Sequence, residues 1–538
     1  MRLRAPRRIP SKEPSMTTIR LQTNQHRLIA NLRHAFNQRS MLGELLQNAR
    51  RAQASDIRIY VTDDCIAVHD NGSGIEDLQS LIHIAESGWK AVIRERENAF
   101  GMGALATLYF AERLMVRSRG QTFSARTADI LAGNPIEVLP ADGTWQGTQI
   151  QLDGVRSPDR HVFLPDWVRS EMRRLCEAFP VRVYVNDVEV PRPLAKPDIR
   201  WRETSMGKVL IDLHGATNQW RCFLQGLPIQ VGSSYAPKQI VLLPDDMVAK
   251  LPDRQHLLNE TSDIPRIQAA VNQAYRQALM DAKSELAGHE FAEWYADACV
   301  ISSNADLLND VPFVPRAWFR NWKDRPAGVC RYWEHYGDDG VTSADAMSEA
   351  GVWRIEDDDG DVLLAEVFLQ AADAYLLEQI NLDAGHWLLR LARPLSAEQI
   401  AVRVGASRHR MEHPGLADWE VALELVNSLQ VGLLEGGELY DVPAIRKDGT
   451  LYVTTEACNV TRLVSDYSVD DRYDEDLEND DEETIRTFIA VGSSSSPDHV
   501  VEALLPRALR YEAQAKLAGA SVRLAFDAEG KLASVSTS

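Results

Sequence analysis

The alternation of apolar and polar positions predicts two helices and a β-hairpin near the start of the chain. Apolar residues recur at helical spacing over about residues 24–36 and again over 41–52. The runs DIRIYV and CIAVHD that follow are rich in β-branched residues, and the polar residues between them are typical of a hairpin turn. ALATLYFAE then predicts a helix, and RLMVRSR and GTQIQL predict strands. This mixture favours an α+β sandwich with helices on one face of a sheet.

A second α+β region follows the first. WVRSEMRRLCEAF predicts a helix and VRVYVND a strand, and the Pro-rich segment 191–197 marks an expected domain boundary. The strand patterns KVLIDLH, WRCFLQG and QIVLL precede a long helix from about Ile264. Beyond about residue 290 the pattern predicts Trp-containing helices, an acidic run, a Ser-rich linker at 492–498, a helix and a closing hairpin.

Composition and charge limit the cellular compartments and the classes of partner that are expected. The six cysteines are scattered and form no CxxC pair, which argues against a zinc ribbon and a disulfide framework. No segment approaches the roughly 20 apolar residues of a membrane span, so we expect a soluble, cytoplasmic protein without a membrane partner. The net charge of −20 would repel a phosphate backbone, so it leaves nucleic acid open as a partner without implying it. We expect the acidic run at 466–483 to be a solvated loop or linker.

Two polar residues share one face of the second predicted helix. Glu44 and Asn48, in ELLQNARRA, are one helical turn apart among apolar neighbours. A solvated helix face is the ordinary explanation of such a pair. A carboxylate that activates water and an amide oxygen that ligands Mg²⁺ would be a chemical one.

The glycine-containing segment DNGSGI comes directly after a predicted strand. Gly72 and Gly74 allow positive φ and let the backbone approach a flat ring closely. Asp70 can accept a hydrogen bond from an exocyclic amine. By itself this segment could be only a turn.

Two further segments suit a nucleotide. In FGMGALATL, Gly101 and Gly103 precede a helix start, where free N–H groups and the helix dipole favour an anion such as a triphosphate. A structural glycine turn is the alternative. In GTQIQL, Gly147 and Thr148 stand at the head of a predicted strand.

Taken together and in order, these four segments resemble the GHKL ATPases, which include gyrase B subunits, ninety-kilodalton heat-shock chaperones, histidine kinases and MutL mismatch-repair proteins. The similarity covers about residues 20–190 and extends more weakly to 290. It implies a Bergerat-type α/β sandwich that binds and hydrolyses ATP with Mg²⁺, followed by a transducer-like α+β domain. It also implies a homodimer.

The resemblance assigns roles around the phosphates. Glu44 matches the general base that polarises the attacking water, and Asn48 matches the Mg²⁺ ligand. Lys250 and Arg254 are candidates for the basic residue with which a transducer domain reaches the γ-phosphate. Many family members have Asp where this chain has Arg51, which puts the water network around the metal in doubt.

The resemblance also assigns the base pocket. Asp70 matches the carboxylate that recognises the adenine amino group, with Thr148 beside it, while Gly72 and Gly74 shape the ring pocket.

A third set of positions matches the phosphate loop and the lid. Gly101, Met102 and Gly103 match the glycine motif that holds phosphates at a helix N-terminus. Ser87 and Lys90, in IAESGWK, are similar to a stretch before the chaperone lid and are expected to touch the nucleotide.

A single hydrophobic core rarely grows past roughly 250 to 300 residues, so several domains are expected. The expected parts are a basic flexible tail (1–19), a GHKL-type ATP-binding domain (20–195), a transducer-like domain (200–290), a helix-rich C-terminal region within a mixed α/β part of the chain (291–465), an acidic and Ser-rich linker (466–497) and a terminal helix and hairpin (498–538).

Three functions remain open at this stage. One is a chaperone-like or remodelling ATPase acting on a protein client, in which ATP closes a lid at 76–99 and promotes dimerisation. The second is a nucleic-acid-linked ATPase clamp of the MutL or gyrase type. The third is a nucleotide-binding module without efficient hydrolysis, which Arg51 keeps open.

Overall fold

This computed structural model divides the chain into two units, Met1–Asp281 and Ala282–Ser538. The residues that it describes are 29, 31–83, 103–141, 146–230, 238–250, 254–320, 322, 325–332, 339–355 and 362–537. Each unit is considered by itself.

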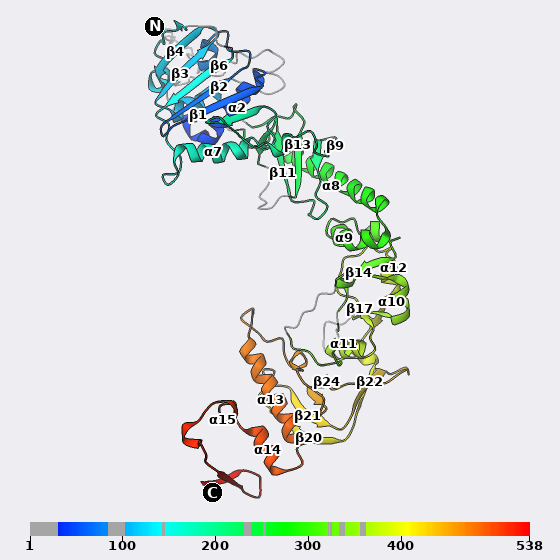
Figure 1. Ribbon diagram of the computed structural model, residues 1–538. Helices are drawn as coiled ribbons and strands as arrows, with labels where there is room; N and C mark the ends of the chain where they lie inside the picture. The colour runs from blue at the N-terminus through cyan, green and yellow to red at the C-terminus, as the bar shows by residue number, and fades with distance from the viewer. Residues whose placement is uncertain are drawn as a thin grey trace, which may run out of the picture. The chain divides into compact units, whose positions relative to one another are not determined.

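An eight-stranded mixed sheet organises the first unit (Figure 1). Its order is β5-β4-β3-β6-β2-β1-β7-β8, in which β1 and β7 pair in parallel and β1, β2, β6 and β3 pair antiparallel. The strands are β1 (Asp56–Val61), β2 (Cys65–Asp70), β3 (Arg113–Ser118), β4 (Gln121–Arg126), β5 (Leu139–Pro140), β6 (Thr148–Asp153), β7 (Arg182–Val185) and β8 (Val188–Glu189). The hairpin expected from DIRIYV and CIAVHD is confirmed as β1 and β2.

Helices cover one face of this sheet. Burial therefore alternates along its strands, because only every second side chain faces the helices. In β1, Ile57, Ile59 and Val61 are buried while Arg58 between them is exposed. Buried residues of three helices share one core with these strands. The helices of this part are α2 (Gln38–Arg51), α3 (Gln79–Ile82), α5 (Gly103–Phe110), α6 (Thr127–Leu131) and α7 (Leu164–Leu175). The expected α+β sandwich is therefore confirmed.

Helix α2 starts where its sequence caps it. The side chain of Asn37 accepts the backbone N–H of Ser40 at 2.8 Å, and the Ser40 hydroxyl accepts the N–H of Asn37 at 3.0 Å. This reciprocal capping satisfies two donors that the first turn leaves open. It fixes the register of α2, and with it the face on which Glu44 and Asn48 lie.

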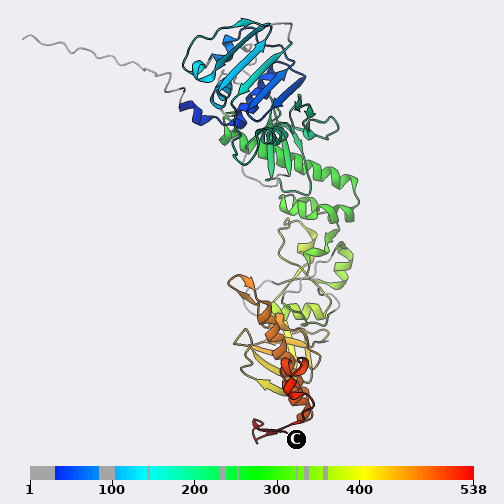
Figure 2. The same cartoon turned by 60° about the vertical axis from the view of Figure 1, so that its left-hand side comes forward.

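A five-stranded sheet of order β12-β11-β13-β10-β9 forms the second part of this unit. Its strands are β9 (Arg202–Thr204), β10 (Gly207–Leu210), β11 (Trp220–Leu224), β12 (Leu227–Ile229) and β13 (Gln239–Leu243). The long helix α8 (Glu260–Glu285) packs on this sheet through Ile267, Val271 and Ala274 (Figure 2). The expected strands and the long helix are present, with the helix starting four residues before Ile264.

The second unit mixes small sheets with short helices. Its strands are β14 (Phe313–Pro315), β15 (Val341–Ser343), β16 (Val352–Ile355), β17 (Tyr375–Leu376), β18 (Arg393–Leu395), β19 (Ile400–Val404), β20 (Ser407–Met411), β21 (Ala422–Val426), β22 (Leu429–Leu433), β23 (Tyr440–Asp441), β24 (Ala444–Lys447), β25 (Thr450–Val453), β26 (Ser468–Val469), β27 (Arg472–Tyr473), β28 (Val522–Phe526) and β29 (Leu532–Thr537). Its helices are α9 (Gly288–Ile301), α10 (Ala344–Ala350), α11 (Val362–Ala371), α12 (Trp387–Leu391), α13 (Glu475–Ser493), α14 (Pro497–Leu504) and α15 (Arg507–Tyr511).

The expectation of a helix-rich region at 291–465 is wrong. Strands β14 to β25 fall in this range, and β20-β21-β25-β24 form a four-stranded sheet. Short apolar runs such as ALELV and LQVGL are too brief to show a period, so they do not distinguish a strand from a helix. The closing hairpin, by contrast, is present as β28 and β29.

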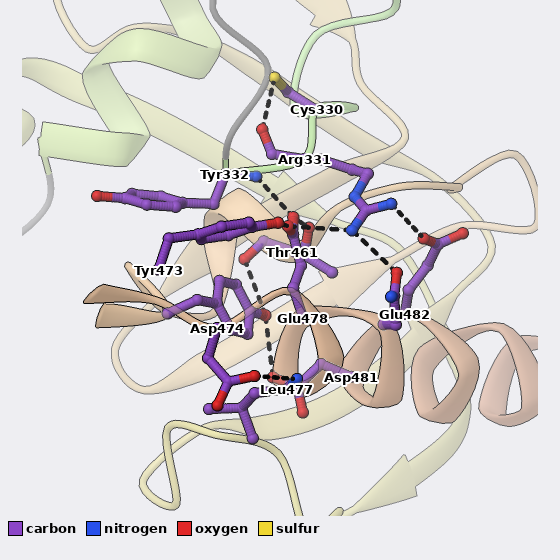
Figure 3. A network of polar contacts seen from close by, with 12 residues as sticks. Cys330, Arg331, Tyr332, Thr461, Tyr473, Asp474, Leu477, Glu478, Asp481 and Glu482 are labelled. Carbon is purple, nitrogen blue, oxygen red and sulfur yellow. Dashed lines mark hydrogen bonds and ion pairs between the residues drawn. The ribbon is translucent and has the colours of Figure 1, made fainter. Parts of the chain in front are cut away.

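The expectation that the acidic run is a linker is also wrong, because residues 475–493 form helix α13. Glu478 is fully buried and lies at the centre of a polar network (Figure 3). Its carboxylate pairs with Arg331 at 3.2 Å, accepts the hydroxyl of Thr461 at 2.6 Å and the N–H of Tyr332 at 2.8 Å, and accepts the hydroxyl of Tyr473. Burial alone would raise the pKa of Glu478, but these hydrogen bonds together lower it.

Asp481, one turn further along α13, is buried as well. Its carboxylate accepts the hydroxyl of Tyr467 at 2.9 Å and the N–H of Ala417 at 3.1 Å. Counting charges could not separate these two inward-facing acids from the solvated ones around them.

Among the helices that the structure describes, none combines the length and the apolar composition of a membrane span.

Replacing Glu478 with Gln removes the charge that faces Arg331. Hydrogen bonds to a charged group contribute about 1.5 to 3 kcal/mol, and Arg331 is partly exposed, so α13 should open more readily in E478Q by about that amount. Amide hydrogen exchange of residues 475–493 is expected to be at least about tenfold faster than in the wild type. The matched control is Glu483→Gln, which removes an exposed carboxylate from the same helix and should leave exchange unchanged. Equal protection in E478Q and the wild type would contradict this role of Glu478.

Candidate functional site

Helix α2 lines the candidate site from one end to the other. Glu44, Asn48 and Ala52 follow one another at four-residue spacing, so they lie along one face of the helix. At 1.5 Å per residue, the distance from Ala52 to Glu44 is roughly 12 Å along the helix axis.

The Ala52 end of this face contacts the glycine segment after β2. The backbone N–H of Ser73 donates to the carbonyl of Ala52 at 2.8 Å. A Cβ atom at Gly72 would lie 2.7 Å from that same carbonyl oxygen and 2.9 Å from Oδ1 of Asp70. Only glycine therefore allows this close approach of the loop to α2. Gly74 adopts a positive φ of 73° in the same loop.

Asp70 ends strand β2 and is held in place by backbone donors. Its Oδ1 accepts the N–H of Gly72 at 2.9 Å, and the backbone N–H of Thr148 also hydrogen-bonds the carboxyl group. Burial raises the pKa of Asp70 above its ordinary value, and these two N–H groups oppose the rise. The sheet register sets Asp70 of β2 directly opposite Thr148 of β6.

A third polar residue, Ser118, extends this pair and was missed by the sequence analysis. Ser118 ends β3 directly opposite Thr148, and its side chain is fully buried. Leu114 and Val116 occupy the preceding inward positions of β3, so a polar side chain at the next inward position interrupts an apolar pattern. That interruption was the available signal, because inward positions of a half-covered sheet are normally apolar.

Near the middle of α2, Glu44 pairs with a cation from the second sheet region. The Nε of Arg254 contacts Oε1 of Glu44, and the two side chains are only 13% and 6% exposed. Arg254 has a φ of 55°, and its N–H donates to the carbonyl of Lys250 at 3.0 Å. Lys250 itself is exposed. Of the two cations singled out from the sequence, Arg254 is therefore the one that reaches the α2 face.

Asn48, between Glu44 and Ala52, has a cation beside it. Nη1 of Arg51 lies 3.4 Å from Oδ1 of Asn48, which is a long contact for a hydrogen bond. A guanidinium next to the amide oxygen competes with a metal ion for that oxygen. Among the described residues, no group of three or more His, Cys, Asp and Glu side chains is arranged to hold a metal. A metal here would therefore rely on Asn48 and on oxygen atoms of a ligand.

Helix α2 also contacts the five-stranded sheet next to Glu44. Nε2 of the buried Gln47 donates to Oε1 of Gln225 at 3.1 Å, and Gln225 belongs to the tight turn between β11 and β12. Gln225 in turn contacts the carbonyl of Asp245. The helix that carries Glu44 and Asn48 is thus tied to the second sheet region by both Gln47 and Glu44.

The glycine motif expected to hold phosphates is only partly described. Gly103 is the first residue of α5, as expected for a glycine motif at a helix start. Gly101 and Met102 lie outside the described residues, and so do Ser87 and Lys90. The positions of these four remain expectations.

Two comparisons with known proteins bear on this site. Residues 36–137 match the family model described as histidine kinase-, DNA gyrase B- and HSP90-like ATPase. The chain is also 27% identical over 172 residues to the DNA mismatch repair protein MutL of Bacteroides fragilis, a match that covers 28% of this chain and 27% of the MutL protein's own length. The matched range contains α2, the β1–β2 hairpin and α5, which are the elements that line the candidate site. The first unit of this chain therefore contains an ATPase-like domain of the GHKL superfamily.

Proposed function

We propose that the first unit binds ATP along the face of α2 and hydrolyses it. The observation that supports this most is the order of groups on that face. Asp70 and Gly72 lie at the Ala52 end, and Glu44 and Arg254 lie roughly 12 Å away along the helix. A flat base, a sugar and a chain of phosphates require these groups in this sequence.

At the base end, Asp70 accepts the amino group of adenine. Its carboxylate is already oriented by two backbone N–H groups, so little rearrangement is needed on binding. Gly72 lets the loop that carries Asp70 approach α2 closely because it has no side chain.

At the phosphate end, Glu44 takes a proton from the attacking water. A general base must lie within hydrogen-bond reach of that water, and the carboxylate of Glu44 lies beside the cation Arg254. Asn48 would hold Mg²⁺ together with phosphate oxygens. When bound, Mg²⁺ supplies neutralising charge to the phosphates.

Arg254 links this chemistry to the second sheet region. Its guanidinium now pairs with Glu44, and a γ-phosphate is a stronger competitor for it than a single carboxylate. Transfer of Arg254 from Glu44 to the phosphate would free the base and pull on the loop that follows β13. The proposal includes closure of residues 76–99 over the nucleotide and dimerisation of the chain, both carried over from the resemblance.

The output of this cycle is proposed to be remodelling of a protein client, as in a chaperone. The acidic residues concentrate in the second unit, which has 22 Lys and Arg against 47 Asp and Glu. Such a surface repels a phosphate backbone and favours a basic protein surface.

A nucleic-acid-linked clamp is the second candidate, and two observations favour it. One is the similarity to MutL. The other is that the first unit is not acidic, with 36 Lys and Arg against 31 Asp and Glu. The overall charge of −20 therefore does not describe the ATPase-like unit.

Glu44→Ala tests the base. Removing a general base typically lowers the rate by a factor of about 10² to 10⁴, so E44A should bind ATP within a few-fold of the wild type and turn over far more slowly. Single-turnover hydrolysis and calorimetry measure the two quantities. Glu203→Ala is the control, since it removes a carboxylate of β9 that pairs with Lys208 on the neighbouring strand β10. A turnover of E44A equal to that of the wild type would refute the assignment, and hydrolysis by neither protein would favour a binding module.

Asp70→Asn tests the base pocket. The variant replaces one acceptor by an amide, so we expect ATP binding at least about tenfold weaker, a change that corresponds to 1.4 kcal/mol. Asp153→Asn, at the opposite end of β6, is the control and should bind ATP normally. Calorimetry that gives the same ATP affinity for D70N and the wild type would exclude this role.

Addition of DNA separates the two candidate outputs. A clamp should hydrolyse ATP faster with DNA at moderate salt, and the stimulation should disappear as salt rises, because phosphate contacts are salt-sensitive. A protein remodeller should show no such response. A salt-sensitive stimulation of several-fold would therefore reverse the order of the two candidates.

A further inference from the structure

Three polar side chains form a row across the inner face of the eight-stranded sheet. The register pairs Asp70 with Thr148 and Thr148 with Ser118, so the row runs over the ends of β2, β6 and β3. Residues directly opposite each other in antiparallel strands point to the same face. The inward positions before them are apolar, as Val68 and Val116 are. The row therefore occupies the edge of the core next to the glycine segment.

The hydroxyl of Ser118 has its full set of partners. It accepts the N–H of Ile75 at 2.8 Å and donates to the carbonyl of Gly147 at 2.9 Å, because a carbonyl can only accept. Its third contact is the Thr148 hydroxyl at 3.3 Å. A serine hydroxyl has one proton and two lone pairs. Since the proton is used on Gly147, Thr148 is left as the donor in this 3.3 Å contact, which is long for a hydrogen bond between two hydroxyls.

The hydrogen bonds of Ser118 determine which groups the Thr148 hydroxyl presents to a ligand. With its single proton directed to Ser118, the Thr148 oxygen offers only lone pairs to a ligand. The neighbouring Asp70 carboxylate accepts N–H groups and also offers lone pairs. Asp70 and Thr148, which are neighbours in the row, are therefore adjacent acceptors. A primary amine has two N–H donors and matches them, whereas a carbonyl oxygen matches neither.

We propose that Ser118 is a positioning residue that makes this pocket select a purine with an exocyclic amine, by holding the Thr148 hydroxyl as an acceptor. The inference rests on the proposed function, because it deepens the base recognition assigned to Asp70. Ser118 acts through Thr148 and does not touch the nucleotide. The hydrogen bond from the N–H of Ile75 to Ser118 also holds the loop that contains Gly74 at the end of β3.

Comparison of ATP with ITP tests the proposal. Inosine carries a carbonyl oxygen where adenosine carries its amine, so the wild type should bind ATP at least about tenfold more tightly than ITP. In Ser118→Ala the Thr148 hydroxyl can rotate and donate to that oxygen. The dissociation constant for ITP divided by that for ATP should therefore fall by about tenfold, mainly because ITP binds more tightly. A merely structural role of Ser118 would weaken both nucleotides equally.

Two further variants keep the test decisive. In Thr148→Val no hydroxyl remains to reorient, so adding Ser118→Ala to it should leave the ratio unchanged, and T148V alone should weaken ATP without improving ITP. Thr127→Val is the matched control, because it removes another buried hydroxyl of the unit, which donates to the carbonyl of Ala111 at 2.7 Å, and should leave the ratio unchanged. T148V can be measured even where S118A does not fold.

The outcomes separate this inference from the function on which it rests. A wild type that binds neither nucleotide would overturn the proposed function, and this inference with it. A wild type that prefers ATP, with the same preference in S118A or unchanged ATP affinity in T148V, would overturn only the role of Ser118.

Discussion

The position of helix α2 is the constraint on which the candidate site depends. Its C-terminal end accepts a hydrogen bond from the glycine loop after β2, and its middle pairs with Arg254 from the second sheet region. The capping by Asn37 and Ser40 sets where the helix begins and hence which face carries Glu44 and Asn48. A helix rotated by one residue would turn both side chains away from the glycine loop.

Because α2 contacts both sheets, the proposed binding of phosphates beside Glu44 would be coupled to the position of the second sheet region. Gln47 is buried against Gln225, and Glu44 is buried against Arg254, so α2 cannot shift without disturbing either contact. Buried polar contacts of this kind are either kept with good geometry or exchanged for others. The proposed exchange of Glu44 for a γ-phosphate at Arg254 is one such event, and it provides a physical route from hydrolysis to conformational change.

Local patterns predicted much of the first unit. The alternation in DIRIYV and CIAVHD gave the β1–β2 hairpin, and helical spacing gave α2, α5 and α7. The pairing of Arg254 with Glu44 could not be foreseen as a contact, because 210 positions separate them. The polar role of Ser118 was missed, although the alternation along β3 predicts that its side chain faces the core. In the second unit, the acidic run misled because composition does not say which carboxylates face inward, and Glu478 and Asp481 do.

The most direct test of the pocket is a crystal structure of the full chain with Mg²⁺ and a non-hydrolysable ATP analogue. We expect the adenine amine beside Asp70 and Thr148 and the γ-phosphate beside Glu44. Arg254 should pair with the γ-phosphate in place of the Glu44 carboxylate. A nucleotide bound away from the α2 face, or a purine turned away from Asp70, would contradict this expectation.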